Sequence, residues 1–423
     1  MIDINLIRDQ PEVVKAGMQK RLLDGALVDT ARTLDARRRE LLVEVETLKA
    51  ERNAASKEIA TFIDKAVRDA RIAEMKKVGD RIDGLEAELE KIDRDLDAAM
   101  AVIPNIPEDI VPAGGEDANI VAREWGDKPG LSFKAKPHWE LGPQLGVINF
   151  DQGAALTGSR FYVLSGAGAR LQRALIAWML ELHIKQGYTE KYTPFMVKGA
   201  TLFGAGQLPK FKDNLYKDHE EDLYMIPTAE VPLTGLHMDE ILDESMLPLR
   251  YTAYSPCFRR EKMSAGRDVR GIKRGHQFDK VEMYKFCRPE ESVAEFEQMV
   301  ADAEATCQAL NLPYRVLLKA AGDTSEAAHI SYDIEVWAAG CEEWLEVSSI
   351  SRVGDYQARR AGIRYRPKGE KGTRFVHTIN GSGLGLPRTL IAVLENNQQA
   401  DGSVLVPPVL HQWMGGIEKI EAQ

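Results

Sequence analysis

The feature that most constrains this chain is a segment without proline, residues 12–103. Its second half repeats apolar residues at alternating spacings of three and four, as in a coiled-coil seam. One row of that seam is Met75, Ile82, Leu89 and Leu96, and the other is Val78, Leu85, Ile92 and Ala99. The first half has Leu34, Leu41, Leu48, Ala55 and Phe62 at intervals of seven, beside a mixed row of Arg38, Val45, Arg52 and Ile59. The repeat loses register at 63–71, so the pattern predicts two long helices.

We expect these helices to fold back on each other as an antiparallel hairpin at about residues 31–101, after a short helical start. Helices of about 30 residues would make an arm about 45–50 Å long, at a rise of 1.5 Å per residue. Charges of both signs outside the seam suit a solvent-exposed arm. A parallel dimeric coiled coil, or two helices packed on a globular core, would give a similar pattern.

A change of composition marks the end of this arm. Residues 104–119 contain Pro104, Pro107, Pro112, Gly114 and Gly115, which is typical of a linker. We therefore expect an N-terminal domain at 1–103, a linker at 104–119 and a second domain at 120–423.

Short runs typical of strands alternate with helical segments in the second domain. The expected strands are 160–164, 194–197, 249–254, 276–286, 314–319, 331–337, 344–349 and 375–379. The expected helices are 169–186 and 384–396. Several of the strands are long, alternate and are separated by turns, so the sheet should be mainly antiparallel, in an α+β fold.

Composition excludes several classes of protein. The net charge is −10, so any nucleic-acid site must be a local basic strip on an acidic surface. The four cysteines form no CxxC pair and have no histidine cluster beside them, so neither zinc nor disulfides are expected. There is no apolar run of about 18 residues, and we expect a cytoplasmic protein that does not contact membranes.

Residues 257–284 carry the strongest chemical signal. A strand ends in Arg259, Arg260 and Glu261, a glycine-containing loop follows, and a second strand returns through Phe278 and Glu282. An arginine fork can hold a phosphate and a carboxylate together, and an aromatic ring offers adenine a stacking face. The pattern therefore suits ATP, although an ordinary charged hairpin with surface ion pairs would also explain it.

Residues 378–398 form a second glycine-rich signal. Gly381, Gly383 and Gly385 precede Arg388 at the start of a helix. Small residues let a nucleotide approach the backbone, so the segment could lie beside a nucleotide. A glycine-rich turn with a solvated arginine is the alternative.

These two segments, with the helix-to-strand segment 187–197, resemble the three signatures of class II aminoacyl-tRNA synthetases in their order and separation. The resemblance narrows to bacterial-type seryl-tRNA synthetases at GAGQLPKF (204–211), IPTAEVPL (226–233), EVSSISRVGDYQARR (346–360) and HTINGSGL (377–384). It covers essentially the whole chain, including the helical hairpin, which that family uses to hold the long variable arm of its tRNA. It implies an antiparallel sheet flanked by helices, usually dimeric through the first signature.

The resemblance also implies a reaction and a set of residues. The family activates L-serine with ATP and transfers it to tRNA(Ser), and it also serylates tRNA(Sec). Carried over by position, the serine-binding residues are Thr228, Ala229, Glu230, Arg259, Glu282 and Ser382. The ATP-binding residues are Arg259, Arg260, Glu261, Arg274, Gly275, Phe278, Glu346, Val347, Ser348, Ser349 and Arg388. Arg259, Glu282 and Arg388 would be catalytic, and Glu346 and Ser349 would ligate Mg²⁺.

Two other functions are compatible with parts of the pattern. A class II-like ligase that charges a carrier protein would lack the helical arm, and a catalytically inactive coiled-coil protein would have lost Arg259, Glu282 or Arg388. The chain departs from the common family pattern at Met263, Gly275 and Pro387, and none of these changes removes a charged group. The implied partners are serine, ATP and tRNA, the last bound across the two subunits of a homodimer.

Overall fold

The computed structural model describes residues 1–262 and 270–422, which form two compact units. The smaller unit comprises Ile2–Gln19 and Leu23–Pro104, and the larger one comprises Met1, Lys20–Leu22 and Asn105–Gln423. Within the described residues, no helix is long and apolar enough to cross a membrane.

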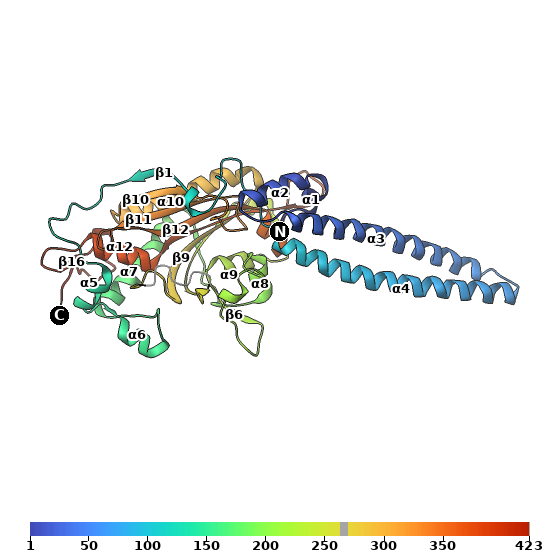
Figure 1. Cartoon of the computed structure of the whole chain (residues 1–423), viewed down its shortest axis with the longest axis horizontal. Helices are drawn as coiled ribbons and strands as arrows, with labels where there is room; N and C mark the ends of the chain where they lie inside the picture. The colour runs from blue at the N-terminus through green and yellow to red at the C-terminus, as the bar shows by residue number, and fades with distance from the viewer. Residues whose placement is uncertain (263–269, 423) are drawn as a thin grey trace. The chain divides into compact units, whose positions relative to one another are not determined.

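The smaller unit is an antiparallel helical hairpin, as the heptad pattern predicts. After α1 (Ile4–Asp9) and α2 (Pro11–Lys20), helices α3 (Ala26–Ile59) and α4 (Lys65–Val102) run side by side (Figure 1). They have 34 and 38 residues, which at 1.5 Å per residue is about 50–57 Å. The side chain of Asp64 caps α4 by accepting hydrogen bonds from the N–H groups of Ala66 and Val67.

The seam of this hairpin is apolar, with ion pairs along its edges. Leu41, Val45 and Leu85 are buried against each other, and Leu48, Leu89 and Ile92 pack beside them. Across the seam, Arg37 pairs with Glu88 at 2.8 Å, Arg38 with Asp93 at 2.6 Å, and Glu44 with Arg81 at 2.9 Å. Exposed pairs of this kind contribute little, so the apolar seam stabilises the arm and the polar row specifies its register.

The larger unit contains an eight-stranded sheet in the order β1-β10-β11-β12-β15-β9-β8-β4. These strands are β1 (Ile120–Trp125), β10 (Tyr314–Leu318), β11 (Ile330–Ala338), β12 (Glu343–Gly354), β15 (His377–Gly385), β9 (Gln277–Cys287), β8 (Leu249–Phe258) and β4 (Thr189–Glu190). Among the described strands of this sheet, only β4 and β8 pair in parallel, so the expected mainly antiparallel sheet is confirmed.

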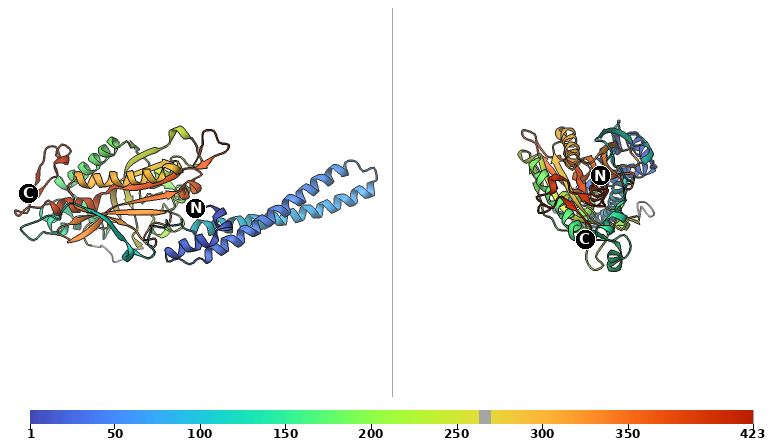
Figure 2. Two further views of the ribbon diagram at one scale, coloured as in Figure 1. Left: turned by 90° about the horizontal axis from the view of Figure 1, so that it is seen from above. Right: turned by 90° about the vertical axis from the view of Figure 1, so that its left-hand side faces the viewer.

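Helices α7 (Gly166–Lys185), α10 (Ser292–Ala309) and α12 (Leu386–Asn396) cover one face of this sheet. Figure 2 shows α10 running along the sheet. Leu171, Met299 and Leu390, one from each helix, share a core cluster with Val281 and Met283 of β9. The face covered by helices is therefore the hydrophobic core of this unit.

Shorter elements surround the sheet. They are α5 (His138–Gln144), β2 (Ile148–Asn149), α6 (Phe150–Thr157), β3 (Val163–Leu164), β5 (Met196–Lys198), α8 (Gly199–Gly204), β6 (Leu223–Met225), α9 (Glu230–Gly235), β7 (Ile241–Asp243), α11 (Tyr356–Ala361), β13 (Arg364–Arg366), β14 (Arg374–Phe375), β16 (Val404–Leu405) and β17 (Lys419–Ile420). Helix α9 begins at Glu230, the last residue of the TAE triplet at 228–230.

Candidate active site

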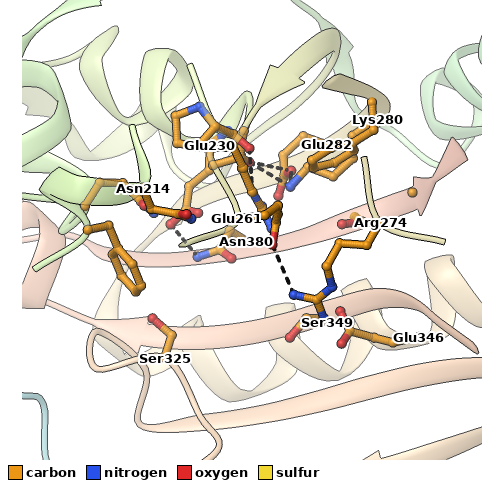
Figure 3. A pocket seen from close by; sticks show the side chains of 18 of the residues that line it. Asn214, Glu230, Glu261, Arg274, Lys280, Glu282, Ser325, Glu346, Ser349 and Asn380 are labelled. Atoms are coloured by element: carbon orange, nitrogen blue, oxygen red, sulfur yellow. Dashed lines mark hydrogen bonds and ion pairs between the residues drawn. The ribbon is translucent and has the colours of Figure 1, made fainter. Parts of the chain in front are cut away.

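A cavity of about 520 Å³ lies on the face of the sheet opposite the helices. Most of the residues that the resemblance implies line it: Thr228, Glu230, Arg259, Glu261, Arg274, Gly275, Phe278, Glu282, Glu346, Val347, Ser349, Ser382 and Arg388. Figure 3 shows Glu230, Glu282 and Arg274 converging with Glu346 and Ser349 from separate segments. Pro387 also lines the cavity, whereas Met263 lies outside the described residues.

The period-two geometry of β9 explains why one strand serves both the core and the cavity. Successive side chains of a strand point to opposite faces. Phe278, Lys280 and Glu282 therefore line the cavity, while Val281 and Met283 between and beside them are fully buried in the helix-covered core.

A bulge in β12 brings the two expected metal ligands to the same face. Residues three apart in a regular strand point to opposite faces, and Glu346 and Ser349 are three apart. Ile334 of β11 pairs with Ser348 while Glu335 pairs with Glu346, so Val347 is an extra residue in the ladder. Both Glu346 and Ser349 consequently line the cavity.

One end of the cavity holds a buried hydrogen-bonded cluster around Glu282. The Thr228 hydroxyl donates to Glu282 Oε2 at 3.0 Å, and Lys280 Nζ forms an ion pair with the same oxygen. Lys280 also donates to Thr228 Oγ1 at 2.7 Å. Because both partners use Oε2, the other oxygen of Glu282 is the one that can accept a bond from a ligand.

Glu230 repeats this arrangement beside Glu282. Its Oε1 accepts hydrogen bonds from Gln357 Nε2 at 2.6 Å and from Asn380 Nδ2 at 3.2 Å, which leaves Oε2 to face a ligand. Burial, and then the neighbouring Glu282 carboxylate, raise the pKa of Glu230 to about 7. Two carboxylates beside one lysine carry net negative charge, so this end of the cavity suits an ammonium group.

The middle of the cavity has an arginine stacked on an aromatic ring. The Arg259 guanidinium lies 5.0 Å from the centre of the Phe278 ring, and its Nε donates to the carbonyl of Pro227 at 3.2 Å. Beside it, Arg274 donates to Glu261 at 3.1 Å. A guanidinium held in place by a backbone bond and a ring can receive phosphate or carboxylate oxygens with little reorganisation.

Arg388 lies at the other end of the cavity. Its Nε donates to the carbonyl of Lys273 at 3.2 Å, and its Nη1 donates to the carbonyl of Glu346 at 2.9 Å. These bonds join the start of α12 to β12 and to the segment that follows Arg270. The charge of Arg388 is thereby held near the oxygen ligands of β12.

The residues around Glu346 and Ser349 fit a hard divalent cation. Asp333 lies on β11 directly opposite Ser349 in the ladder, and its Oδ1 is buried without a hydrogen-bond partner among the described residues. Burial and the Glu346 carboxylate raise the pKa of Asp333 to about 7. Lys319 pairs with the other oxygen of Asp333 at 2.8 Å, so Oδ1 is the oxygen left for a cation. A group of carboxylate and hydroxyl oxygens is the kind of ligand set that Mg²⁺ prefers.

Three of the implied residues do not line the cavity. Ala229 is fully buried in a separate apolar cluster, Arg260 lies over the ring of Tyr216, and the Ser348 hydroxyl donates to the carbonyl of Ser382 at 2.7 Å. Ala229 and Ser348 can support the wall from behind, and Arg260 points elsewhere.

Sequence reasoning missed Lys280, Gln357 and Asn380. The alternation of β9 could have found Lys280, because it lies two residues before Glu282 in the same strand. Asn380 lies two residues before Ser382 in the glycine-rich strand and follows from the same rule. Gln357 is contributed by α11, and no local pattern links it to Glu230.

Comparisons with known proteins agree with this geometry. The family model described as seryl-tRNA synthetase N-terminal domain matches residues 1–107, and the model described as tRNA synthetase class II core domain (G, H, P, S and T) matches residues 210–397. The chain is 60% identical to the serine–tRNA ligase of Roseiflexus sp. (strain RS-1) over 99% of both chains. It is 54% identical to the serine–tRNA ligase of Chloroflexus aurantiacus over 99% of this chain and 100% of that relative.

A solved structure has the same fold over its full length. The crystal structure of seryl-tRNA synthetase from Pyrococcus horikoshii complexed with ATP covers 100% of both chains with a TM-score of 0.95 and 38% identity. Both the hairpin and the sheet with its cavity thus have counterparts in that family. This chain belongs to the seryl-tRNA synthetases of class II.

Proposed function

We propose that this chain is a serine–tRNA ligase, which forms seryl-adenylate from L-serine and ATP and transfers the seryl group to the 3′ end of tRNA(Ser). The observation that carries the proposal is the paired carboxylates Glu230 and Glu282. Each has one oxygen fixed by protein donors and one left for a ligand. Arg259 is held beside them, because its Nε donates to the carbonyl of Pro227, the residue before Thr228. The full-length relatives at more than half identity support it.

The first step needs no general base in this geometry. The carboxylate of serine attacks the α-phosphorus of ATP in line, the bond to the bridging oxygen breaks, and pyrophosphate leaves. Arg259 and Arg388 lie at the two ends of the phosphate region, where they stabilise the charge that builds up on the oxygens. Phe278 gives the adenine a stacking face beside Arg259, and Glu261 holds Arg274 toward the nucleotide.

Serine is selected by its two polar groups. The ammonium is received by Glu230 and the hydroxyl by the open oxygen of Glu282, with Ser382 on the adjoining strand. A pocket built to bond a hydroxyl rejects alanine because its own buried groups are then left unpaired, an effect that can reach about 10⁴-fold. Lys280 orients Glu282 by pairing with its Oε2, without occupying the oxygen that serine needs.

Glu346 and Ser349 would hold Mg²⁺, which neutralises phosphate charge when it is bound with ATP. The bulge at Val347 supplies the shared orientation of these two ligands, and Arg388 is anchored on the carbonyl of Glu346 itself. No zinc is part of this proposal.

In the second step, the 3′-hydroxyl of the terminal adenosine of tRNA attacks the seryl carbonyl, and AMP leaves. We propose that the arm of α3 and α4 binds tRNA(Ser), and also tRNA(Sec). The domain boundaries expected at 103 and 119 separate this arm from the catalytic domain. Lys65 and Arg68 are exposed near its tip and take part in no ion pair within the described part of the chain. A cytoplasmic homodimer that binds tRNA across its subunits completes the proposal.

The test is serine-dependent ATP–pyrophosphate exchange, measured with each of the twenty amino acids, followed by charging of total tRNA. Arg259→Ala and Arg260→Ala are a matched pair, because both remove one arginine from the same strand end. We expect Arg259→Ala to abolish exchange, and Arg260→Ala to retain most of it. Exchange with another amino acid in preference to serine, or full exchange in Arg259→Ala, would contradict the proposal.

A further inference from the structure

We propose that His138 is a positioning residue for the ATP site, which it serves by anchoring the segment from Arg270 to Arg274. His138 opens α5, is fully buried, and lines no part of the cavity. This inference rests on the proposed function, since it assigns a role in nucleotide binding.

His138 connects two parts of the chain that both reach the nucleotide. Its Nε2 accepts a hydrogen bond from the backbone N–H of Ile272 at 3.1 Å. Its Nδ1 and its own backbone N–H both bond Glu395 Oε1, at 2.8 and 2.7 Å. Glu395 is in the last turn of α12, the helix whose first turn carries Arg388.

The bond to Ile272 fixes the tautomer of the imidazole. Because Nε2 accepts a hydrogen bond from the backbone N–H of Ile272, the ring hydrogen must be on Nδ1, which donates it in a hydrogen bond to Glu395. Glu395 Oε2 accepts two more bonds, from the N–H groups of Gly340 at 2.9 Å and Cys341 at 2.8 Å. The Cys341 thiol also donates to Glu395 Oε1, at 3.2 Å. Both imidazole nitrogens, both carboxylate oxygens and the thiol are thus used in hydrogen bonds.

These hydrogen bonds also indicate whether the cluster binds a metal ion or only joins segments of the chain by hydrogen bonds. His138, Cys341 and Glu395 place ligand atoms within 4.8 Å of one another, as a metal centre would. A metal on Nδ1 of a neutral imidazole would put the hydrogen on Nε2, where it would face the N–H of Ile272. The arrangement therefore fits a hydrogen-bonded cluster that joins segments of the chain, and not a cation site.

The segment held by His138 leads directly into the nucleotide site. The carbonyl of Lys273, next to Ile272, accepts the bond from Arg388 Nε, and Arg274 bonds Glu261. Gly271 approaches the imidazole so closely, at a φ of +71°, that a Cβ there would lie 1.9 Å from His138 Nε2. A shift of His138 would accordingly move Lys273 and Arg274 together.

Neighbouring side chains hold the same segment from other directions. The ring of Trp139 lies 4.4 Å from the Arg270 guanidinium, and Lys273 Nζ pairs with Glu343 at 2.5 Å. These contacts are made by the ends of long side chains, whereas the bond to Ile272 is a buried bond to the backbone. His138 is therefore the contact that determines the path of this segment.

Two substitutions separate the two bonds of His138. In His138→Gln the side-chain amide can reach the position of Nε2 and accept from Ile272, whereas in His138→Asn it reaches only the position of Nδ1 and can still donate to Glu395. We expect His138→Asn to raise the KM for ATP in pyrophosphate exchange about 10-fold, the loss associated with one buried hydrogen bond. The KM for serine should change less than about 2-fold, and His138→Gln should restore the KM for ATP to within about 3-fold of wild type.

Two further variants keep the test decisive. Met299→Ala creates a cavity in the helix-covered core and so controls for lost stability. It should lower the melting temperature without changing the ratio of the KM for ATP to the KM for serine. Gly271→Ala disturbs the same contact from the loop side and should raise the KM for ATP selectively. Equal KM values for ATP in His138→Asn, His138→Gln and Met299→Ala, or an unchanged KM in Gly271→Ala, would overturn the inference. A wild-type protein without serine-dependent exchange would instead count against the proposed function.

Discussion

Serine binding should weaken selectively when the pH is lowered from about 7.5 to about 5.5. Glu230 faces the position proposed for the serine ammonium, and its pKa in the empty protein is about 7. Only the ionised carboxylate attracts an ammonium, so protonation removes the binding-competent form. The charged groups around it are Glu282, Lys280 and Arg259, which all belong to the same cavity.

The size of this effect follows from the pKa. For a pKa of about 7, the ionised fraction of Glu230 is about 0.76 at pH 7.5 and about 0.03 at pH 5.5. The apparent dissociation constant of a ligand is its intrinsic value divided by the competent fraction. The KM for serine should therefore rise about 25-fold over this range, whereas the KM for ATP should change little.

Pyrophosphate exchange at saturating ATP, with serine varied at each pH, measures this directly. Glu230→Gln is the matched control, because its amide oxygen can still accept from Gln357 and Asn380. Its KM for serine should be high at pH 7.5 and nearly independent of pH. A wild-type KM that stays constant down to pH 5.5, or a Gln variant with the same pH dependence, would refute this account of Glu230.

The same substitution gives a second readout in the absence of substrates. Burial raises the folded-state pKa of Glu230 to about 7, above the ordinary value of 4.5, so ionised Glu230 destabilises the folded protein increasingly from pH 4.5 to pH 7. Glu230→Gln should therefore melt at a higher temperature than wild type at pH 8. That difference should disappear as the pH falls to about 4.5.

Two further predictions concern the nucleotide and the tRNA. Phe278→Leu should raise the KM for ATP about 10- to 100-fold, the range expected from the loss of one base–aromatic stack, while the KM for serine stays nearly constant; a change in the KM for serine alone would contradict the stacking role. The double variant Lys65→Glu/Arg68→Glu should lower tRNA charging at least about 10-fold and leave pyrophosphate exchange unchanged, since each lost phosphate contact weakens binding and steepens its loss with salt. The double variant Lys91→Glu/Arg94→Glu makes the same charge change nearer the base of α4. An equal loss of tRNA charging in that variant would show that charging depends on the net charge of the arm and not on the basic residues at its tip.

Local periodicity predicted much of the fold. The heptads gave the hairpin because its seam is a property of each helix alone, and most of the long strands followed from alternation. The helix at Ser292–Ala309 is not among the expected elements, although Phe296, Met299, Val300 and Ala303 recur at helical spacing and are buried. The predicted strand at 375–379 is divided between β14 and β15, because Val376 lies between two different sheets.

The site is only partly a local property of the sequence. Arg259, Phe278 and Glu282 belong to one hairpin, so their types and spacing indicate the chemistry. Gln357 and His138 act on that hairpin from distant segments, and nothing in the neighbourhood of either residue in the sequence reveals its partner. Glu230 could be named from the sequence, but its raised pKa depends on burial and on Glu282, which only the folded chain brings beside it.

The bulge at Val347 determines which changes of length β12 can accept over evolutionary time. Val347 is the extra residue, so a chain without it would place Glu346 and Ser349 two residues apart in a regular strand, still on the same face. Inserting one residue between Ser349 and Ile350 would instead turn every following residue of the strand to the other face, including Ile350, which is fully buried. No nearby substitution can repair such a shift. Descendants of this chain are therefore free to vary in length at the tip of the arm, in surface turns or by loss of the bulged residue, while the regular part of β12 after Ser349 must keep its number of residues.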